Sequence, residues 1–185
     1  MAMSEEDLTR LMREGAATYL DALCAFQQFK THAAETSRSV LRNHIVDLAK
    51  SMKLPAPSSN DVVMWCNPDG VNDPWQDDWA FLSSRIWFPP PCKFWFYLGV
   101  SFEREKTKAV TYVVCIYGVE NAALFKKFKT AFQCKDHFYC DETDRECQFY
   151  WKWDSKSDLR SEFEKMMVYV TAAWKGVGGW TAMRA

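Results

Sequence analysis

The first third of the chain places its apolar residues three and four positions apart. Between residues 8 and 29 these residues are Leu8, Leu11, Met12, Tyr19, Leu20, Leu23, Cys24, Phe26 and Phe29. Such spacing puts the side chains on one face of an α-helix and predicts an amphipathic helix. A second helical pattern covers residues 40–54, after a polar stretch at 31–37. The sequence therefore predicts one long N-terminal helix, or two helices divided at that stretch.

The middle of the chain changes to the pattern of β-strands. Strands are predicted at residues 62–65, 79–88, 94–103 and 110–117, with a charged turn at 105–108 joining the last two. In the segment 94–103, Phe94, Phe96 and Leu98 share one face, while Trp95 and Tyr97 occupy the other. Apolar residues on both faces are typical of central strands that are covered on both sides.

The last third returns to helices around one more strand. Helices are predicted at residues 124–132 and from a cap at Asp154 or Ser155 to about Gly176, with a strand at 149–153 between them. The order is α(α)-β-β-β-β-α-β-α. It predicts an α+β fold, in which N-terminal, late-middle and C-terminal helices pack on an antiparallel meander sheet of about five strands. A length of 185 residues predicts a single domain, 1–185, with a flexible tail at 176–185.

Charge and cysteine content restrict the environment and the partners. Charged residues make up 25% of the chain and the net charge is -1, which excludes a globally basic nucleic-acid binder. The acidic N-terminus lacks the apolar core of a signal peptide, and no apolar run approaches the roughly 20 residues that span a membrane. We therefore expect a cytoplasmic protein without a membrane contact. The seven cysteines are then expected to be reduced thiols or metal ligands rather than a disulfide framework.

Three cysteines and one histidine form the densest group of soft metal ligands. Their pattern is Cys134-x2-His137-x2-Cys140-x6-Cys147. Thiolates and imidazoles at short spacings are the ligands of tetrahedral zinc, although this pattern matches no standard zinc signature. No glutamate accompanies the histidine in the H-x-E or H-E-x-x-H pattern of catalytic zinc sites, so the predicted metal is structural zinc. The alternative is that the chain has no cofactor and these cysteines pack as small apolar residues.

A basic strip lies on the predicted helix 124–132 and just after it. Its members are Lys126, Lys127, Lys129 and Lys135, interleaved with Phe125, Phe128 and Phe132. Lysines could bind phosphates while rings stack on bases. The phenylalanines also fit the core-facing stripe of an amphipathic helix, which would leave the lysines as its solvated face. The second interpretation is favoured, so nucleic-acid binding is not.

The order of elements over residues 5–153 resembles the core of the restriction-endonuclease-like PD-(D/E)xK nucleases. In that family an acidic residue on one central strand and an E-x-K triplet on the next hold magnesium and activate water. Here the segment 110–117 has no charged side chain, and Glu103 and Lys106 lie at the hairpin tip with a different spacing. The resemblance therefore implies a nucleic-acid-binding or degenerate nuclease-like protein without a recognisable active site.

Aromatic residues suggest the leading hypothesis for function. They make up 16% of the chain, and no arrangement of residues typical of catalysis accompanies them. Tryptophan and tyrosine are enriched in the energetic centres of protein interfaces. The sequence therefore favours a non-enzymatic protein-interaction module that binds a protein partner or forms a homo-oligomer. The candidate contact residues are Trp75, Trp151, Trp153 and Trp180.

Overall fold

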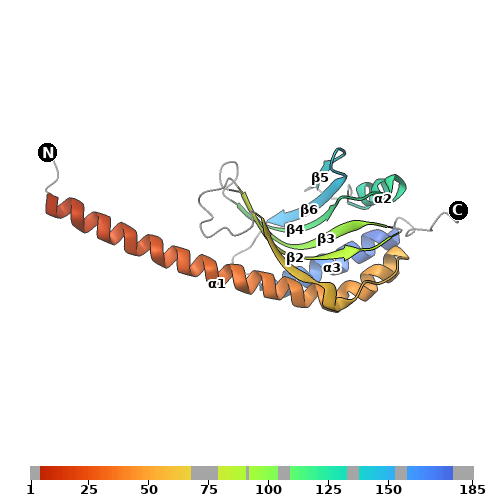
Figure 1. Ribbon diagram of the computed structural model, residues 1–185, viewed down its shortest axis with the longest axis horizontal. Helices are drawn as coiled ribbons and strands as arrows, with labels where there is room; N and C mark the ends of the chain where they lie inside the picture. The colour runs from red at the N-terminus through yellow and green to blue at the C-terminus, as the bar shows by residue number, and fades with distance from the viewer. Residues whose placement is uncertain are drawn as a thin grey trace. The chain divides into compact units, whose positions relative to one another are not determined.

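A computed structural model describes residues 5–67, 79–90, 92–103, 109–132, 138–152 and 158–176 (Figure 1). These residues form three α-helices and a six-stranded antiparallel sheet, which confirms the α+β class. In chain order the elements are α1 (Glu5–Met52), the short 3-10 helix η1 (Ser59–Asp61), β1 (Val63–Asn67), β2 (Trp79–Phe88), β3 (Phe94–Glu103), β4 (Ala109–Tyr117), α2 (Ala122–Phe132), β5 (Phe138–Asp141), β6 (Glu146–Lys152) and α3 (Leu159–Gly176). The predicted flexible tail lies outside the described residues, apart from Gly176.

Helix α1 continues through the polar stretch at residues 31–37. The hydroxyl of Thr31 donates to the backbone carbonyl of Gln27 at 3.2 Å. The hydroxyl of Ser37 donates to the backbone carbonyl of Ala34 at 3.0 Å. Bonds of this kind satisfy the hydroxyls inside the helix, so they do not interrupt it. The helix ends where Lys53 adopts a left-handed backbone, with a φ of 56°.

The chain forms two compact units, residues 1–32 and residues 33–185. The boundary lies within helix α1, so the first unit holds the N-terminal part of α1 and the second holds the remainder of α1 with the sheet, α2 and α3. The assignment of residues 1–185 to a single domain stays a prediction.

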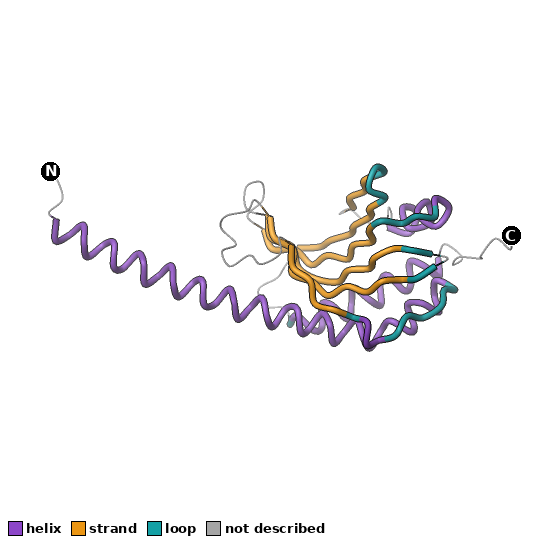
Figure 2. Tube along the Cα trace, in the orientation of Figure 1, coloured by secondary structure: helices purple, strands orange, loops and turns teal. Residues whose placement is uncertain are grey.

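The strand order of the sheet is β1-β2-β3-β4-β6-β5, and all neighbours are antiparallel. Figure 2 shows the strands in orange. Strands β1 to β4 form the predicted meander. Strand β6 joins the free side of β4, and β5 adds an edge strand through a hairpin with β6. Strand β5 makes the sheet one strand larger than the sheet of about five strands that the sequence predicts.

The helices pack on one face of the sheet, which we call the helix face. There the Ser84 hydroxyl of β2 accepts a buried hydrogen bond of 3.0 Å from the Ser37 hydroxyl of α1. The ring of Tyr112 on β4 meets Phe163 of α3 at 5.7 Å between centroids. Helices α2 and α3 both start on a capping side chain: Asn121 accepts from the Leu124 amide at 2.9 Å, and Asp158 from the Ser161 amide at 3.0 Å. The expected caps Asp154 and Ser155 lie outside the described residues.

The opposite face of the sheet is rich in rings, and we call it the aromatic face. Its residues are Trp65, Phe81, Arg85, Trp95, Tyr97, Val113, Cys115 and Tyr150, which alternate along the strands with those of the helix face. Phe81, Tyr97, Val113 and Cys115 are buried, and the partly buried Trp65, Trp95 and Tyr150 pack against them. The described helices pack on the helix face, so the predicted covering of both faces stays a prediction for the aromatic face. On this face, within the described residues, the rings shield one another.

Candidate functional site

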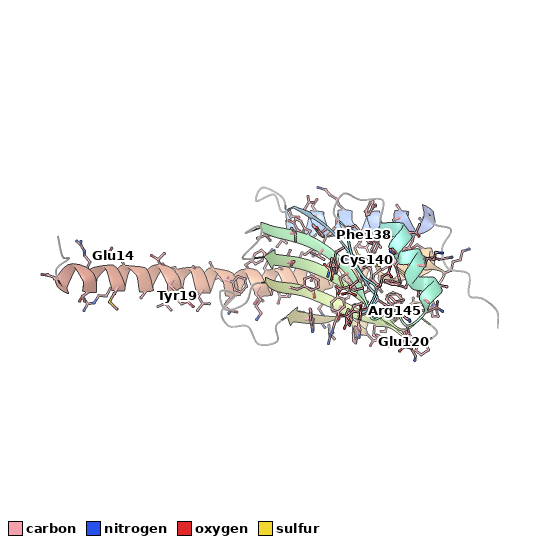
Figure 3. All side chains as sticks on the ribbon, turned by 90° about the horizontal axis from the view of Figure 1, so that it is seen from above. Glu14, Tyr19, Glu120, Phe138, Cys140 and Arg145 are labelled. Atoms are coloured by element: carbon pink, nitrogen blue, oxygen red, sulfur yellow. The ribbon has the colours of Figure 1, made fainter. Side chains whose placement is uncertain are left out.

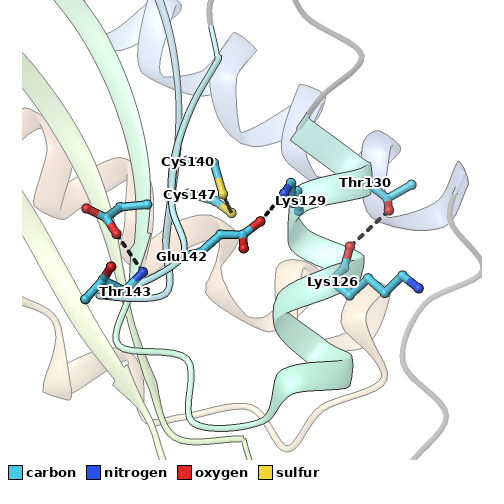
Figure 4. A network of polar contacts seen from close by, with 8 residues as sticks. Lys126, Lys129, Thr130, Cys140, Glu142, Thr143 and Cys147 are labelled. Atoms are coloured by element: carbon cyan, nitrogen blue, oxygen red, sulfur yellow. Dashed lines mark hydrogen bonds and ion pairs between the residues drawn. The ribbon is translucent and has the colours of Figure 1, made fainter.

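Two of the four predicted zinc ligands face each other across the β5–β6 hairpin. Cys140 on β5 lies opposite Cys147 on β6, with 3.7 Å between their Sγ atoms (Figure 4). Cys147 is fully buried, whereas Cys140 is half-buried. The pairing register of the two strands brings these thiols together although six residues separate them in the sequence.

The turn of this hairpin is fixed by local hydrogen bonds. One carboxylate oxygen of Asp141 accepts from the backbone amides of Thr143 at 2.7 Å and Asp144 at 3.2 Å. Aspartate commonly makes such bonds in tight turns. These bonds hold the pKa of Asp141 below its usual value. Arg145 completes the turn with a left-handed backbone, at a φ of 49°.

An ion pair connects the hairpin to α2. The Nζ atom of Lys129 lies 2.5 Å from a carboxylate oxygen of Glu142. This pairing raises the pKa of Lys129 and lowers that of Glu142. Burial raises the pKa of Cys147, and the neighbouring Cys140 raises it further, while Lys129 opposes the shift. Cys147 is therefore a neutral thiol near pH 7.

The structure describes only two of the four predicted zinc ligands. Cys134 and His137 lie outside the described residues, and among those that are described no three His, Cys, Asp or Glu side chains gather into a metal site. The 3.7 Å between the two sulfurs is close to the edge of a tetrahedron with zinc–sulfur bonds of about 2.3 Å, which is about 3.8 Å. Structural zinc stays a prediction with two of its ligands in a compatible arrangement.

The predicted basic strip is divided between different environments. Lys126 is exposed, Lys129 pairs with Glu142, and Lys135 lies outside the described residues. Two of the interleaved rings, Phe128 and Phe132, are fully buried against Trp174 and Phe149. Stacking on bases would require these two rings to leave the core. Lys127, on the same helix, is half-buried. Nucleic-acid binding by the strip stays a prediction.

The predicted contact tryptophans fall mostly outside the described part of the chain. Trp75, Trp153 and Trp180 are not described, and Trp151 is placed only by its backbone pairing with Tyr112. The tryptophans whose side chains are described are Trp65, Trp87, Trp95 and Trp174. Trp174 belongs to the core beneath α2, where its ring meets Phe128 at 4.6 Å between centroids.

Arg85 is a charged residue of the aromatic face that the sequence patterns did not single out. Its guanidinium carbon lies 4.4 Å from the ring centre of Trp95 and 5.4 Å from that of Trp65, so both rings offer it a cation–π contact. Its Nε atom is buried and has no hydrogen-bond partner among the described residues. Burial raises the pKa of the neighbouring Tyr97, and the hydrogen bond and charge of Arg85 oppose that shift. In the sequence, Arg85 is the one charged residue of the predicted strand 79–88, and this was the signal that could have identified it.

The N-terminal unit presents apolar side chains to solvent. The exposed fractions are 67% for Met12, 43% for Tyr19 and 57% for Leu20; Tyr19 is labelled in Figure 3. Met12, Tyr19 and Phe26 stand seven residues apart, and Ala16 and Leu23 each follow one of them by four. We call these five residues the heptad stripe. A helix that carries such a stripe normally buries it against another surface.

Comparison with known proteins adds no relative: no protein-family model, no curated protein and no solved structure matches this chain. Over the described residues, no helix is both long enough and apolar enough to cross a membrane. The function must therefore be argued from the sites themselves.

Proposed function

We propose that this protein is a non-enzymatic interaction module that pairs with a second copy of itself through residues 5–32 of α1. The observation that carries the proposal is the exposure of large apolar side chains, Met12 at 67% and Tyr19 at 43%, at helical spacing. Exposed apolar patches of this kind mark interaction surfaces.

The spacing of the heptad stripe favours another helix as the partner surface. Alternating steps of four and three residues, from Met12 through Ala16, Tyr19 and Leu23 to Phe26, create the seam of a two-stranded coiled coil. In proteins most helical stability comes from the packing of an amphipathic face rather than from helix propensity. Pairing would therefore stabilise this segment as well as cover the stripe.

The charge distribution favours a second copy in antiparallel orientation. The segment begins with Glu5, Glu6 and Asp7 and carries Lys30 near its other end. Antiparallel pairing brings Glu5, Glu6 and Asp7 of one copy towards Lys30 of the other, and it also aligns the two helix dipoles favourably. Parallel pairing would place the acidic starts together. A symmetric pair of this kind closes on itself and leaves no further copy to recruit.

The test is the molar mass of full-length variants, measured by light scattering after size exclusion. The variant Met12→Glu with Tyr19→Glu charges the stripe and places a strong helix former at both positions. The matched control is Ala17→Glu with Gln28→Glu, two exposed positions on the other side of the helix. We expect a dimer for the parent chain and the control and a monomer for the stripe variant. Equal masses for all three chains would contradict the proposal.

A structural zinc site is the second candidate, supported by the spacing of Cys140 and Cys147. Metal analysis of the full chain purified under reducing conditions tests it. One zinc per chain that is lost in Cys147→Ser is the expected result, and a zinc content far below one per chain would remove the candidate. Nothing in the geometry favours the nuclease-like alternative to the same degree.

A further inference from the structure

We propose that Cys140 and Cys147 are a redox-sensitive pair that closes reversibly into a disulfide across the β5–β6 hairpin. The two residues are direct partners in the strand register, and their Sγ atoms lie 3.7 Å apart. A disulfide bond is about 2.05 Å long, so the sulfurs need to approach by about 1.7 Å. Rotation of two side chains on neighbouring strands covers such a distance without a change of strand pairing.

The two thiols differ in access in the way that a stepwise reaction requires. Cys140 belongs to the edge strand β5 and is half-buried, so a small oxidant can reach it. Cys147 is fully buried on β6, in the part of the hairpin that lies beside α2 (Figure 4). Cys140 is therefore the residue that reacts first, and Cys147 the one that resolves the intermediate.

The oxidant we name is a low-molecular-weight disulfide such as oxidised glutathione. The thiolate of Cys140 attacks one sulfur of the oxidant, which forms a mixed disulfide and releases one glutathione thiolate that takes up a proton. Cys147 then attacks Sγ of Cys140 while its proton passes to the departing glutathione thiolate, which forms the internal disulfide and releases the second glutathione as a thiol. In sum, the two protein thiols are oxidised and one glutathione disulfide is reduced to two thiols.

The product would fix the edge of the sheet. Among the described strands, β5 pairs with β6 alone. A covalent link between the two strands would keep β5 attached to the sheet even when its backbone hydrogen bonds with β6 break. The inference does not depend on self-association, because the hairpin and the heptad stripe belong to different units.

The test is peptide mapping of the full chain after incubation in glutathione buffers of increasing oxidation, with a chelator present to remove zinc. Remaining thiols are blocked under acid denaturing conditions before digestion. We expect a peptide in which Cys140 is joined to Cys147, lighter by two hydrogens than the sum of its parts, which disappears again in excess reduced glutathione. The parent chain alone gives this result, so the test does not rely on a variant that folds.

Two variants define the order of the steps. Cys147→Ser should accumulate glutathione on Cys140, whereas Cys140→Ser should leave Cys147 unmodified. Cys24→Ser, which removes an exposed cysteine of the other unit, should keep the internal link. The proposal is overturned if the parent chain retains both thiols in every buffer, keeps a lasting mixed disulfide at Cys140, or joins Cys140 to any other cysteine.

Discussion

A Cβ atom on Gly99 would lie 2.2 Å from the carbonyl oxygen of Leu82 on the neighbouring strand. It would also lie 2.6 Å from the Cβ of Ser83. Gly99 stands on the aromatic face, between Ser83 of β2 and Val113 of β4 in the register. The absence of a side chain there lets the backbones of β2 and β3 approach closely, as glycine does where strands bend.

Gly99→Ala is therefore expected to destabilise the protein strongly. The new methyl group meets backbone rather than a flexible side chain, so strands must shift, at a cost of about 3 kcal/mol. Ser101→Ala, two residues further along the same face of β3, serves as the control and should cost less than about 1 kcal/mol. Urea denaturation of both variants measures the difference. Equal stabilities would show that the sheet opens at this point without strain.

The buried hydroxyls of Ser37 and Ser84 should behave as one unit. Ser37 shares its one hydroxyl proton between the Ala34 carbonyl and the Ser84 hydroxyl, and Ser84 donates to the same carbonyl, each at 3.0 Å. Replacing either serine by alanine removes a buried hydrogen bond and should cost about 1 to 2 kcal/mol. The double variant should cost less than the sum of the two, because the interaction can be lost only once. Additive free energies of unfolding would contradict the coupling between α1 and β2.

Cys92 should resist alkylation at a pH at which Cys24 reacts. Burial raises the pKa of Cys92 from 9.0 to about 11, whereas Cys24 is exposed. The thiolate is the reactive form, so iodoacetamide at pH 8 should modify Cys24 and spare Cys92 until the protein unfolds. The folded state keeps the Cys92 proton and the unfolded state releases it above its ordinary pKa. The free energy of unfolding should therefore be unaffected by this group below pH 9 and fall between about pH 9 and 11.

Removing Arg85 should raise the pKa of Tyr97. Burial already raises that pKa, and the hydrogen bond and positive charge of Arg85 counteract the rise. In Arg85→Gln the charge is lost, so the phenolate of Tyr97 should form at a higher pH than in the parent chain. Phenolate absorbance against pH measures the shift, and Tyr97→Phe identifies the transition that belongs to this residue. A lower pKa in Arg85→Gln would contradict the contact.

The fold class and most elements follow from the sequence because the period of the apolar residues changes visibly between helices and strands. Strand β5 has four residues, with Asp141 at its end, and depends on pairing with β6, so no local pattern defines it. The polar residues at 31–37 resemble a helix break, yet Thr31 and Ser37 bond to their own helix.

The candidate site residues, too, could be predicted from the sequence only in part. Spacing alone pointed to Cys140 and Cys147, since soft ligands that lie close in sequence can meet across a turn. Their direct opposition depends on strand register, which sequence spacing leaves open. Arg85 was missed because its position between Trp65 and Trp95 arises from three different strands.

The central claim is that residues 5–32 pair two copies of the chain, and sedimentation equilibrium of the full chain over a wide concentration range tests it most directly. The single chain has a mass of 21.5 kDa. We predict a concentration-dependent equilibrium that approaches twice this mass, and that Met12→Glu with Tyr19→Glu shifts to the single-chain mass. A mass of 21.5 kDa at every concentration of the parent chain would contradict the claim.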